Sequence, residues 1–104
     1  MMNAIKNLFG IGTKTDYAQL VKDGAIIVDV RSKGEFAGGH IRGSINIPVD
    51  QIGNNLNKLK DKSKPVITCC ASGMRSASAK SLLTSKGYAE VYNGGPWSSL
   101  QYKL

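Results

Sequence analysis

Short runs of apolar and β-branched residues recur along the chain. The run at 25–30 is apolar except for Asp29 and does not alternate with polar residues, which is typical of a central strand covered on both faces. Further strands are predicted at 44–47, 66–69 and 89–92, each rich in β-branched or aromatic residues. These segments supply the strands for one sheet.

The intervals between the predicted strands carry apolar residues at helical spacing. We predict one helix from Thr15, which can cap it, to Gly24, a residue suited to a left-handed stop. Two more helices are predicted, around 52–59 and over 76–86. Strands that alternate with helices predict an α/β fold with a mostly parallel central sheet flanked by helices on both faces. In such sheets, ligands bind beyond the carboxyl ends of the strands.

Length and composition indicate a single globular domain. At 104 residues the chain is about one domain long, and we expect an N-terminal extension at 1–14 followed by the domain at 15–104. The hydrophobic fraction of 41% and the charged fraction of 20% exclude disordered, collagen-like and coiled-coil classes.

The charge balance narrows the choice of partners. The chain has 14 basic and 7 acidic residues, and its net charge of +7 favours an anionic substrate. No nucleic-acid partner is expected, because the basic residues are not interleaved with aromatic ones. We also expect no membrane partner and a cytoplasmic location, since there is neither an apolar stretch of about 20 residues nor a secretory signal.

The cysteine count bears on chemistry more than on stability. Cys69 and Cys70 are adjacent, and neighbouring cysteines form only a strained disulfide, so we do not expect them to form a stabilising disulfide. Reduced thiols fit a reducing compartment. With one histidine and two adjacent cysteines, no zinc site is expected, and no cofactor is predicted.

One segment combines several features of a reactive thiol. The 66–69 strand runs into Cys70 and a short loop that becomes the 76–86 helix. A thiol there faces the unpaired N–H groups and the positive dipole end of the first helical turn, both of which favour the thiolate. Arg75 adds a positive charge, and Gly73 permits successive N–H groups to point inward as an anion-binding nest. An isolated cysteine is usually a small buried residue, but this pattern favours a reactive one.

At this point the sequence resembles the rhodanese-like family of sulfurtransferases, from Tyr17 to Trp97. The family patterns are Asp-x-Arg followed by Glu-Tyr/Phe, then Gly-His-Ile-Pro-Gly-Ala-x-Asn-Ile-Pro, then Cys-x-x-Gly-x-Arg-Ser. Three separate blocks match them in order: IVDVR at 27–31 with Glu35 and Phe36, GHIRGSINIP at 39–48, and CASGMRS at 70–76.

The resemblance implies the family's α/β fold and a sulfurtransferase activity. Cys70 is then the catalytic nucleophile, which takes a sulfane sulfur from thiosulfate or a related donor and passes it, as a persulfide, to a thiophilic acceptor. The implied partners are a small anionic sulfur donor and a thiol or cyanide acceptor, with an acceptor protein as an alternative. Asp29 and Arg31 are expected near the loop as supports. The implied sulfur-binding loop consists of Ala71, Ser72, Gly73, Met74, Arg75 and Ser76.

Two other functions remain open. A cysteine phosphatase or arsenate reductase of related fold wraps a tetrahedral oxyanion with Cys-x5-Arg. That spacing separates Cys69 from Arg75, whereas Cys70 and Arg75 form the shorter Cys-x4-Arg. Because side chains alternate along a strand, we predict that Cys69 points away from Cys70 and belongs to the core. The second alternative is a non-catalytic rhodanese-like module that binds a partner or carries persulfide.

Two polar residues in the matching blocks have structural interpretations. His40 is the single histidine of the chain, and we predict that it positions a turn through side-chain hydrogen bonds rather than acting as a base. Asp29 ends an apolar strand, so we predict that it is a buried hydrogen-bond acceptor.

Overall fold

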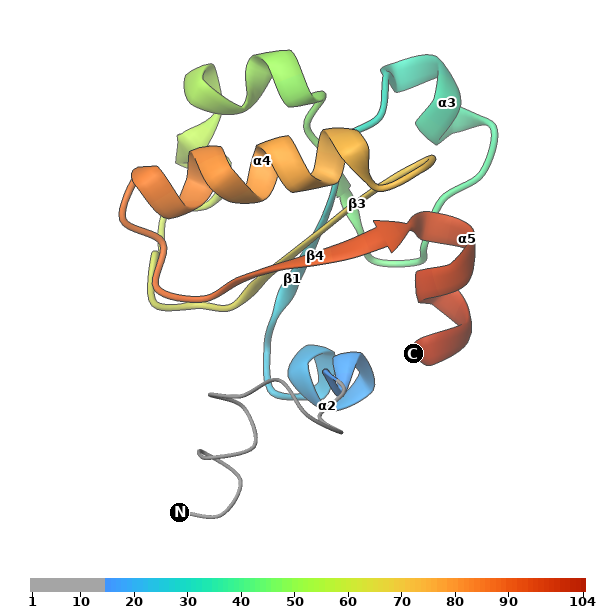
Figure 1. Cartoon of the computed structure of the whole chain (residues 1–104), viewed down its shortest axis with the longest axis horizontal. Helices are drawn as coiled ribbons and strands as arrows, with labels where there is room; N and C mark the ends of the chain where they lie inside the picture. Colours follow the sequence, from blue (N-terminus) through green and yellow to red (C-terminus); the bar gives the residue numbers. More distant parts are fainter. Residues whose placement is uncertain (1–14) are drawn as a thin grey trace.

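The computed structural model describes residues 15–104, and the extension expected at 1–14 lies outside the described residues. Within this range, four strands form one sheet in the order β2-β1-β3-β4, and each neighbouring pair is parallel. Helices lie on both sides of the sheet (Figure 1). The predicted α/β fold is therefore confirmed. The strands are β1 (Ile26–Asp29), β2 (Ile45–Asn46), β3 (Val66–Cys70) and β4 (Val91–Pro96).

The strand that leads to the candidate nucleophile lies inside the sheet. β3 pairs with β1 on one side and with β4 on the other, and its residues are all buried. Asp29 at the end of β1 lies opposite Cys69. The register between β3 and β4 shifts after Thr68, so that Cys70 pairs with Pro96. Because parallel strands end at the same edge, the carboxyl ends of β1, β3 and β4 come together around Cys70.

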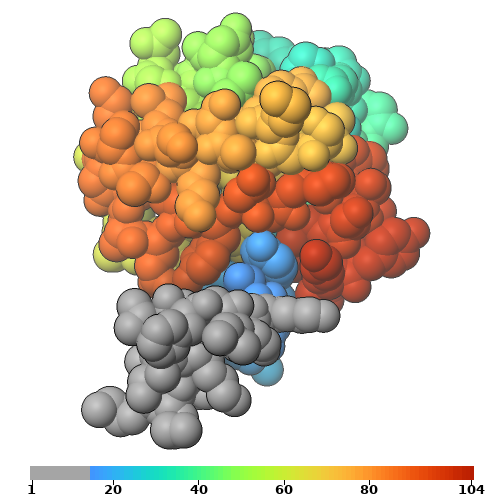
Figure 2. All heavy atoms as spheres, viewed as in Figure 1, coloured from blue at the N-terminus to red at the C-terminus, as the bar shows by residue number. Residues whose placement is uncertain are grey.

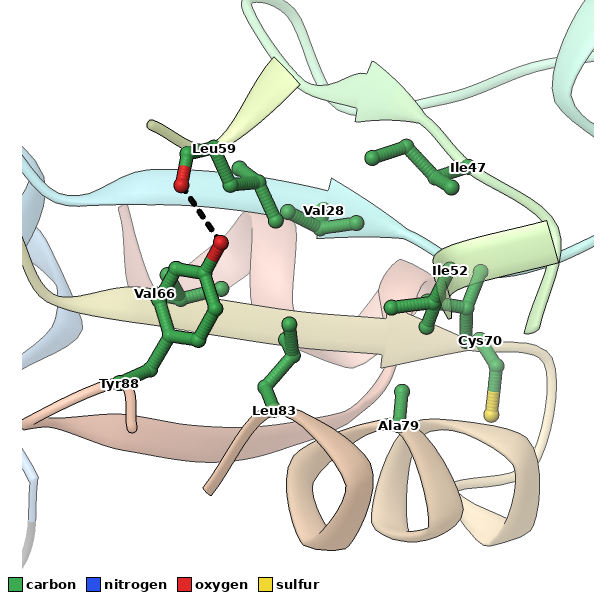
Figure 3. Packing of buried hydrophobic residues seen from close by; sticks show 10 residues of the cluster. Val28, Ile47, Ile52, Leu59, Val66, Cys70, Ala79, Leu83 and Tyr88 are labelled. Atoms are coloured by element: carbon green, nitrogen blue, oxygen red, sulfur yellow. Dashed lines mark hydrogen bonds between the residues drawn. The ribbon is translucent and has the colours of Figure 1, made fainter. Parts of the chain in front are cut away.

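One face of the sheet is covered by α4 (Met74–Ser85) and two short 3₁₀ helices, η1 (Val49–Asn54) and η2 (Leu56–Lys58). The apolar cluster under them contains Cys70, whose side chain points toward α4, and Leu83 of that helix (Figure 3). Burial of this helix face stabilises the element that follows the candidate loop.

The opposite face is covered by α2 (Tyr17–Lys22) and α5 (Trp97–Leu100), with η3 (Gln101–Lys103) directly after α5. The cluster on this face includes Ile67 and Cys69. Alternation along β3 therefore sends the two adjacent cysteines into different cores, as the sequence predicted.

The helix predicted around 52–59 is replaced by η1 and η2. Asn55 separates them with φ of −127°, which lies outside the helical region. Gly53 and the neighbouring asparagines have weak helix propensity, so the segment covers the sheet in short 3₁₀ turns. Ile52 and Leu59, two of the apolar residues at helical spacing, are buried, but the spacing did not indicate the type of helix.

The last strand occupies 91–96 rather than the predicted 89–92. Glycine is rare within strands, so the sequence indicates an end before Gly94. The structure places Gly94 inside β4, where a Cβ atom would lie 2.8 Å from Leu100 Cδ2 and 2.9 Å from the Thr68 carbonyl oxygen. Close approach of neighbouring backbone and side chains therefore explains this glycine.

Two short helices were not predicted, α3 (Lys33–Ala37) and α5. The start of α3 has a capping box, in which the Ser32 hydroxyl accepts from the Glu35 N–H and the Glu35 carboxylate accepts from the Ser32 N–H. The Ser-x-x-Glu spacing is a sequence signal that could have revealed this helix. None of the helices within 15–104 is long and apolar enough to cross a membrane.

Candidate active site

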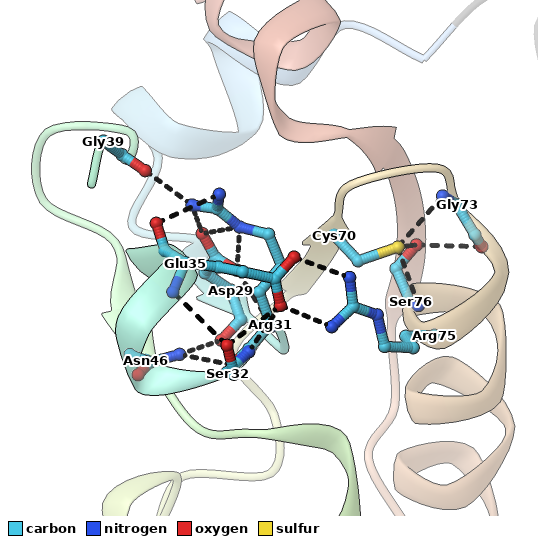
Figure 4. A network of polar contacts seen from close by, with 10 residues as sticks. All are labelled: Asp29, Arg31, Ser32, Glu35, Gly39, Asn46, Cys70, Gly73, Arg75 and Ser76. Atoms are coloured by element: carbon cyan, nitrogen blue, oxygen red, sulfur yellow. Dashed lines mark hydrogen bonds and ion pairs between the residues drawn. The ribbon is translucent and has the colours of Figure 1, made fainter. Parts of the chain in front are cut away.

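The candidate nucleophile Cys70 stands where β3 turns into α4. Residues 71–73 form the turn, and Gly73 has a φ of +103°. An L side chain in this left-handed region costs about 1–2 kcal/mol, so glycine is the favoured residue there, as the sequence indicated. α4 begins at Met74, two residues before the predicted start, so its first turn closes directly around the thiol (Figure 4).

Hydrogen-bond donors of the loop surround the sulfur of Cys70. The N–H of Gly73 donates to Sγ at 2.9 Å, and the N–H of Ser76 donates to it at 3.3 Å. The Ser76 hydroxyl lies 3.3 Å from the same sulfur. Figure 4 shows Cys70, Gly73 and Ser76 converging on this point. Two backbone N–H groups of the loop therefore point at the nucleophile, in partial agreement with the predicted nest of successive N–H groups.

These contacts change the ionisation of the thiol. Burial raises the pKa of Cys70, but hydrogen bonds from the side chain and backbone of Ser76 and from the backbone of Gly73 and Ser72 outweigh it, and the net pKa is lowered. A lowered pKa increases the thiolate fraction near neutral pH, and the thiolate is the nucleophilic form. The environment therefore favours the thiolate, which is the form that attacks an electrophilic sulfur.

A residue of β4 completes the contacts of Ser76. The Ser76 hydroxyl lies 2.6 Å from Asn93 Oδ1, and Asn93 Nδ2 donates to the Gly73 carbonyl oxygen at 3.3 Å. The N–H of Gly95 also donates to Asn93 Oδ1, at 2.9 Å. The Ser76 hydroxyl also lies 3.0 Å from the Gly73 carbonyl oxygen. Because a hydroxyl has a single proton, Ser76 can donate to only one of Asn93, this carbonyl and a thiolate at Cys70. Asn93 thereby joins β4 to the loop.

Cys69 has the opposite environment. It is fully buried in the cluster that contains Ile67 and Leu100. Burial raises the pKa of its thiol to about 12, and the nearby carboxylate of Asp29 adds to the rise. Cys69 is therefore an inert thiol at neutral pH, in agreement with its predicted place in the core.

The predicted supports, Asp29 and Arg31, form a buried ion pair beside the loop. Arg31 donates to Asp29 Oδ1 through Nε at 2.9 Å and to Oδ2 through Nη2 at 2.7 Å. Arg31 also donates to the Gly39 carbonyl at 2.7 Å, and its guanidinium lies 4.6 Å from the ring centroid of Trp97. Asn46 donates to the Asp29 and Arg31 carbonyls at 3.0 and 2.9 Å. Asp29 is thus the buried acceptor that the sequence predicted.

Arg75 is held by a carboxylate. Its two Nη atoms donate to the two oxygens of Glu35 at 2.7 and 3.0 Å, which joins the start of α4 to α3 (Figure 4). In the space-filling view these two elements lie side by side at the surface (Figure 2). The prediction that Arg75 adds a full positive charge to the loop is modified, because its charge is paired with Glu35. The hydrogen-bond donors of Ser76, Gly73 and Ser72 are the main groups that lower the pKa of Cys70.

His40 has the structural role that the sequence predicted. Its Nδ1 lies 2.7 Å from the Phe36 carbonyl oxygen, and its ring stacks on the Phe36 ring with centroids 3.7 Å apart. Both contacts hold the turn after α3. Among residues 15–104, no group of three His, Cys, Asp or Glu side chains is placed to hold a metal ion.

Comparison with known sequences matches the profile of the Rhodanese-like domain to residues 13–95. The chain belongs to the rhodanese-like family. It is 40% identical over 83 residues to an uncharacterized Escherichia coli protein, YibN, covering 77% of this chain and 58% of that protein. It is 34% identical over 79 residues to the thiosulfate sulfurtransferase GlpE of Pseudomonas fluorescens, covering 75% of this chain and 72% of that protein.

A solved structure agrees with this assignment. A rhodanese with anions from E. coli has a TM-score of 0.68 and 30% identity, and the match covers 72% of this chain and 89% of that one. The chain spans somewhat over half the length of the first curated relatives that it matches. Some of the relatives in this family are thiosulfate sulfurtransferases, and others are uncharacterized.

The rhodanese-like loop of this chain divides into two sets of residues. The structure brings Gly73 and Ser76 onto the Cys70 sulfur. Ala71, Ser72 and Met74 are exposed at the mouth, and Met74 is 79% exposed. The catalytic and binding roles assigned to these residues stay predictions.

Three contributors to the site were not predicted: Glu35 as the partner of Arg75, Asn46 behind the Asp29–Arg31 pair, and Asn93 beside Ser76. One signal was available for the last two. Asn46 ends β2, and Asn93 directly follows the strand predicted at 89–92; parallel sheets place their ligand sites at such strand ends.

Proposed function

We propose that the protein is a sulfurtransferase that moves a sulfane sulfur from thiosulfate or a related donor to a thiophilic acceptor through a persulfide on Cys70. The observation that carries this proposal is the arrangement of polar groups around the Cys70 sulfur: the N–H groups of Gly73 and Ser76 donate to it, and the Ser76 hydroxyl lies 3.3 Å from it. Donors fixed in advance around one sulfur atom stabilise negative charge on it without reorganisation.

In the first step the Cys70 thiolate attacks the outer sulfur of the donor. A bond forms between Sγ and that sulfur, the donor's S–S bond breaks, and its electron pair leaves with the rest of the donor. From thiosulfate, the products are the Cys70 persulfide anion and sulfite. The loop N–H groups then face a sulfur chain that carries negative charge, which they are oriented to stabilise.

In the second step an acceptor attacks the outer sulfur of the persulfide. Cyanide forms thiocyanate, and the bond electrons return to Sγ as thiolate. A thiol, free or on an acceptor protein, reacts in the same way. No cofactor takes part. The proposal includes a cytoplasmic setting, because Cys70 must stay reduced, and both cysteines are free thiols.

The phosphatase alternative has less support in this geometry. It needs Cys69 as the nucleophile, but the Cys69 side chain lies in the opposite core and the pKa of its thiol is raised to about 12. A non-catalytic persulfide carrier shares the Cys70 chemistry of the first step and differs only in lacking turnover.

The test is intact-mass measurement of the reduced protein after incubation with thiosulfate, with Cys70→Ser and Cys69→Ser as matched variants. We expect the wild type and Cys69→Ser to gain about 32 Da, one sulfur on the nucleophile, and Cys70→Ser to gain nothing. Cyanide should then restore the original mass and release thiocyanate. Hydrolysis of an aryl phosphate that depends on Cys69, without sulfur loading from any sulfane donor, would refute the proposal.

A further inference from the structure

The single basic residue of the sulfur-binding loop, Arg75, is already bound to an anion. Residues 71–74 carry no charge, and Arg75 is the one cation between Cys70 and Ser76. Both of its Nη atoms donate to the Glu35 carboxylate in a bidentate pair, and each partner's side chain is 38% exposed. The hydrogen bonds from Arg75 and Ser32 lower the pKa of Glu35 to about 2, so this carboxylate is ionised throughout the physiological range.

This pair matters because sulfane donors differ in charge. Thiosulfate is a dianion whose sulfonate end faces outward when its outer sulfur meets the thiolate, and it leaves as sulfite, another anion. A dianion that approaches a thiolate is repelled by it, and a cation with free donors reduces that repulsion; a guanidinium is the best match for a group of oxyanions. Glu35 takes two of the five N–H donors of Arg75 and pairs its charge, so thiosulfate gains the full charge and the paired donors only when it displaces Glu35.

The second guanidinium near the loop, that of Arg31, is also paired with a carboxylate. Arg31 is nearly buried and forms its ion pair with Asp29 at 2.7 Å. By contrast, the mouth of the loop is formed by the uncharged side chains of Ala71, Ser72 and Met74, all exposed. The thioether of Met74 is polarisable and weakly polar, and it suits a sulfur-containing or apolar ligand better than a sulfonate.

We infer that Glu35 is a specificity-determining residue that disfavours dianionic donors, and that the donor suited to this loop is the persulfide of a thiol. This inference rests on the proposed function. The Cys70 thiolate attacks the outer sulfur of R–S–SH, the Sγ–S bond forms, and the S–S bond breaks. The outer sulfur keeps its proton, so the products are the Cys70 persulfide and the thiolate R–S⁻. This donor has no sulfonate, so it does not need a cation that binds one.

The decisive experiment compares donors in the wild type and in Glu35→Gln. Glutamine keeps the capping interaction with Ser32, since Ser-x-x-Gln is also a capping box, but it releases Arg75 from the ion pair. The donors are thiosulfate, methanethiosulfonate, in which a methyl group replaces one charged oxygen, and 2-hydroxyethyl persulfide, which has no carboxylate or sulfonate. The rate of sulfur loading at Cys70 is followed by intact mass at subsaturating donor concentration.

We expect Glu35→Gln to raise the loading rate with thiosulfate about tenfold, because one charge-assisted bidentate interaction becomes available to the dianion. The rates with 2-hydroxyethyl persulfide and methanethiosulfonate should change less than about twofold, since the first has no oxyanion group and the second carries one negative charge fewer than thiosulfate. High salt should reduce the increase in the thiosulfate rate, because the interaction between Arg75 and thiosulfate is partly exposed to solvent.

Two controls separate this effect from others. Glu90→Gln removes one negative charge at an exposed position outside the loop and should leave all donor rates unchanged. The double variant Glu35→Gln with Arg75→Gln should return the thiosulfate rate to the wild-type level or below it, because the released cation is gone. A gain that persists in the double variant would show that Arg75 is not its source and would overturn the inference.

The remaining outcomes also decide the question. If Glu35→Gln folds normally and changes the rates for all donors by the same factor, the specificity inference is wrong while the sulfurtransferase proposal stands. If no donor loads Cys70 in any variant, the proposed function itself fails. Thermal unfolding of each variant confirms that rates are compared between folded proteins.

Discussion

Cys69 and Cys70 share a peptide bond and a strand, yet the sheet separates them into two environments. Cys70 faces the start of α4, where backbone N–H groups and a hydroxyl lie against its sulfur. Cys69 faces the apolar cluster under α2 and α5, with the Asp29 carboxylate nearby and no donor to its sulfur among the hydrogen bonds of residues 15–104. The pKa of Cys70 is lowered, and that of Cys69 is raised to about 12. Reactivity is therefore a property of the face and not of the residue type.

The largest expected effect is on sulfur transfer. Cys70→Ser should abolish transfer, because a serine hydroxyl at that position has no accessible anion at neutral pH. Cys69→Ser should keep transfer but lower the free energy of unfolding by about 1 kcal/mol or more, because it buries a hydroxyl in an apolar cluster. Turnover assays measure the loss of transfer in both variants, and urea unfolding measures the change in their free energy of unfolding. Equal loss of turnover in two folded variants would show that the comparison is wrong.

The second prediction concerns the ionisation of Cys70. In the Cys69→Ser background, the iodoacetamide rate plotted against pH should have a midpoint below the free-thiol value of about 8.5. Ser76→Ala should move this midpoint upward, because it removes the hydroxyl hydrogen bond that helps lower the pKa of Cys70. Thr84→Ala, an exposed change at the far end of α4, is the matched control and should leave the midpoint in place. A wild-type midpoint at or above the free value contradicts the assigned environment.

The third prediction uses stability at alkaline pH. The folded pKa of Cys69 is raised above its unfolded value, so its contribution to stability is complete below about pH 8.5 and is lost as pH rises toward 12. In that window the unfolded state releases a proton that the folded state keeps, a slope of about −1.4 kcal/mol per pH unit. Between these two pH values, the free energy of unfolding measured in urea should fall with this slope in the wild type relative to Cys69→Ala. Parallel curves would mean that the Cys69 thiol ionises normally in the folded protein.

The smallest expected effect is on the backbone of the loop. Gly73→Ala should lower the free energy of unfolding by about 1–2 kcal/mol, because alanine must adopt the left-handed φ of +103°. If the loop relaxes instead, the Gly73 N–H should turn away from the sulfur, and the alkylation midpoint of Cys70 should rise. Gly34→Ala, in α3 with open space around its Cβ position, is the control and should be neutral or slightly stabilising.

Several features of this fold could be predicted because they depend on neighbours in the sequence. The apolar run at 25–30 and the Cys-x-x-Gly spacing indicated the central strand and the strand–loop–helix site. The boundaries were less accurate. Gly94 continues β4 because its backbone lies against β3 and Leu100, and this contact is not visible in the local sequence.

The sequence by itself determined the separation of the two thiols, because alternation along any strand sends adjacent side chains to opposite faces. It also determined the left-handed glycine three residues after the nucleophile. Only the tertiary structure decided which groups complete the site. Glu35 is 40 residues from Arg75, and Asn93 is 17 residues from Ser76. These partners meet because the strand order β2-β1-β3-β4 brings α3, α4 and the end of β4 to one edge of the sheet. The positive charge of Arg75 is evident from the local sequence, but its pairing with the Glu35 carboxylate depends on the strand order.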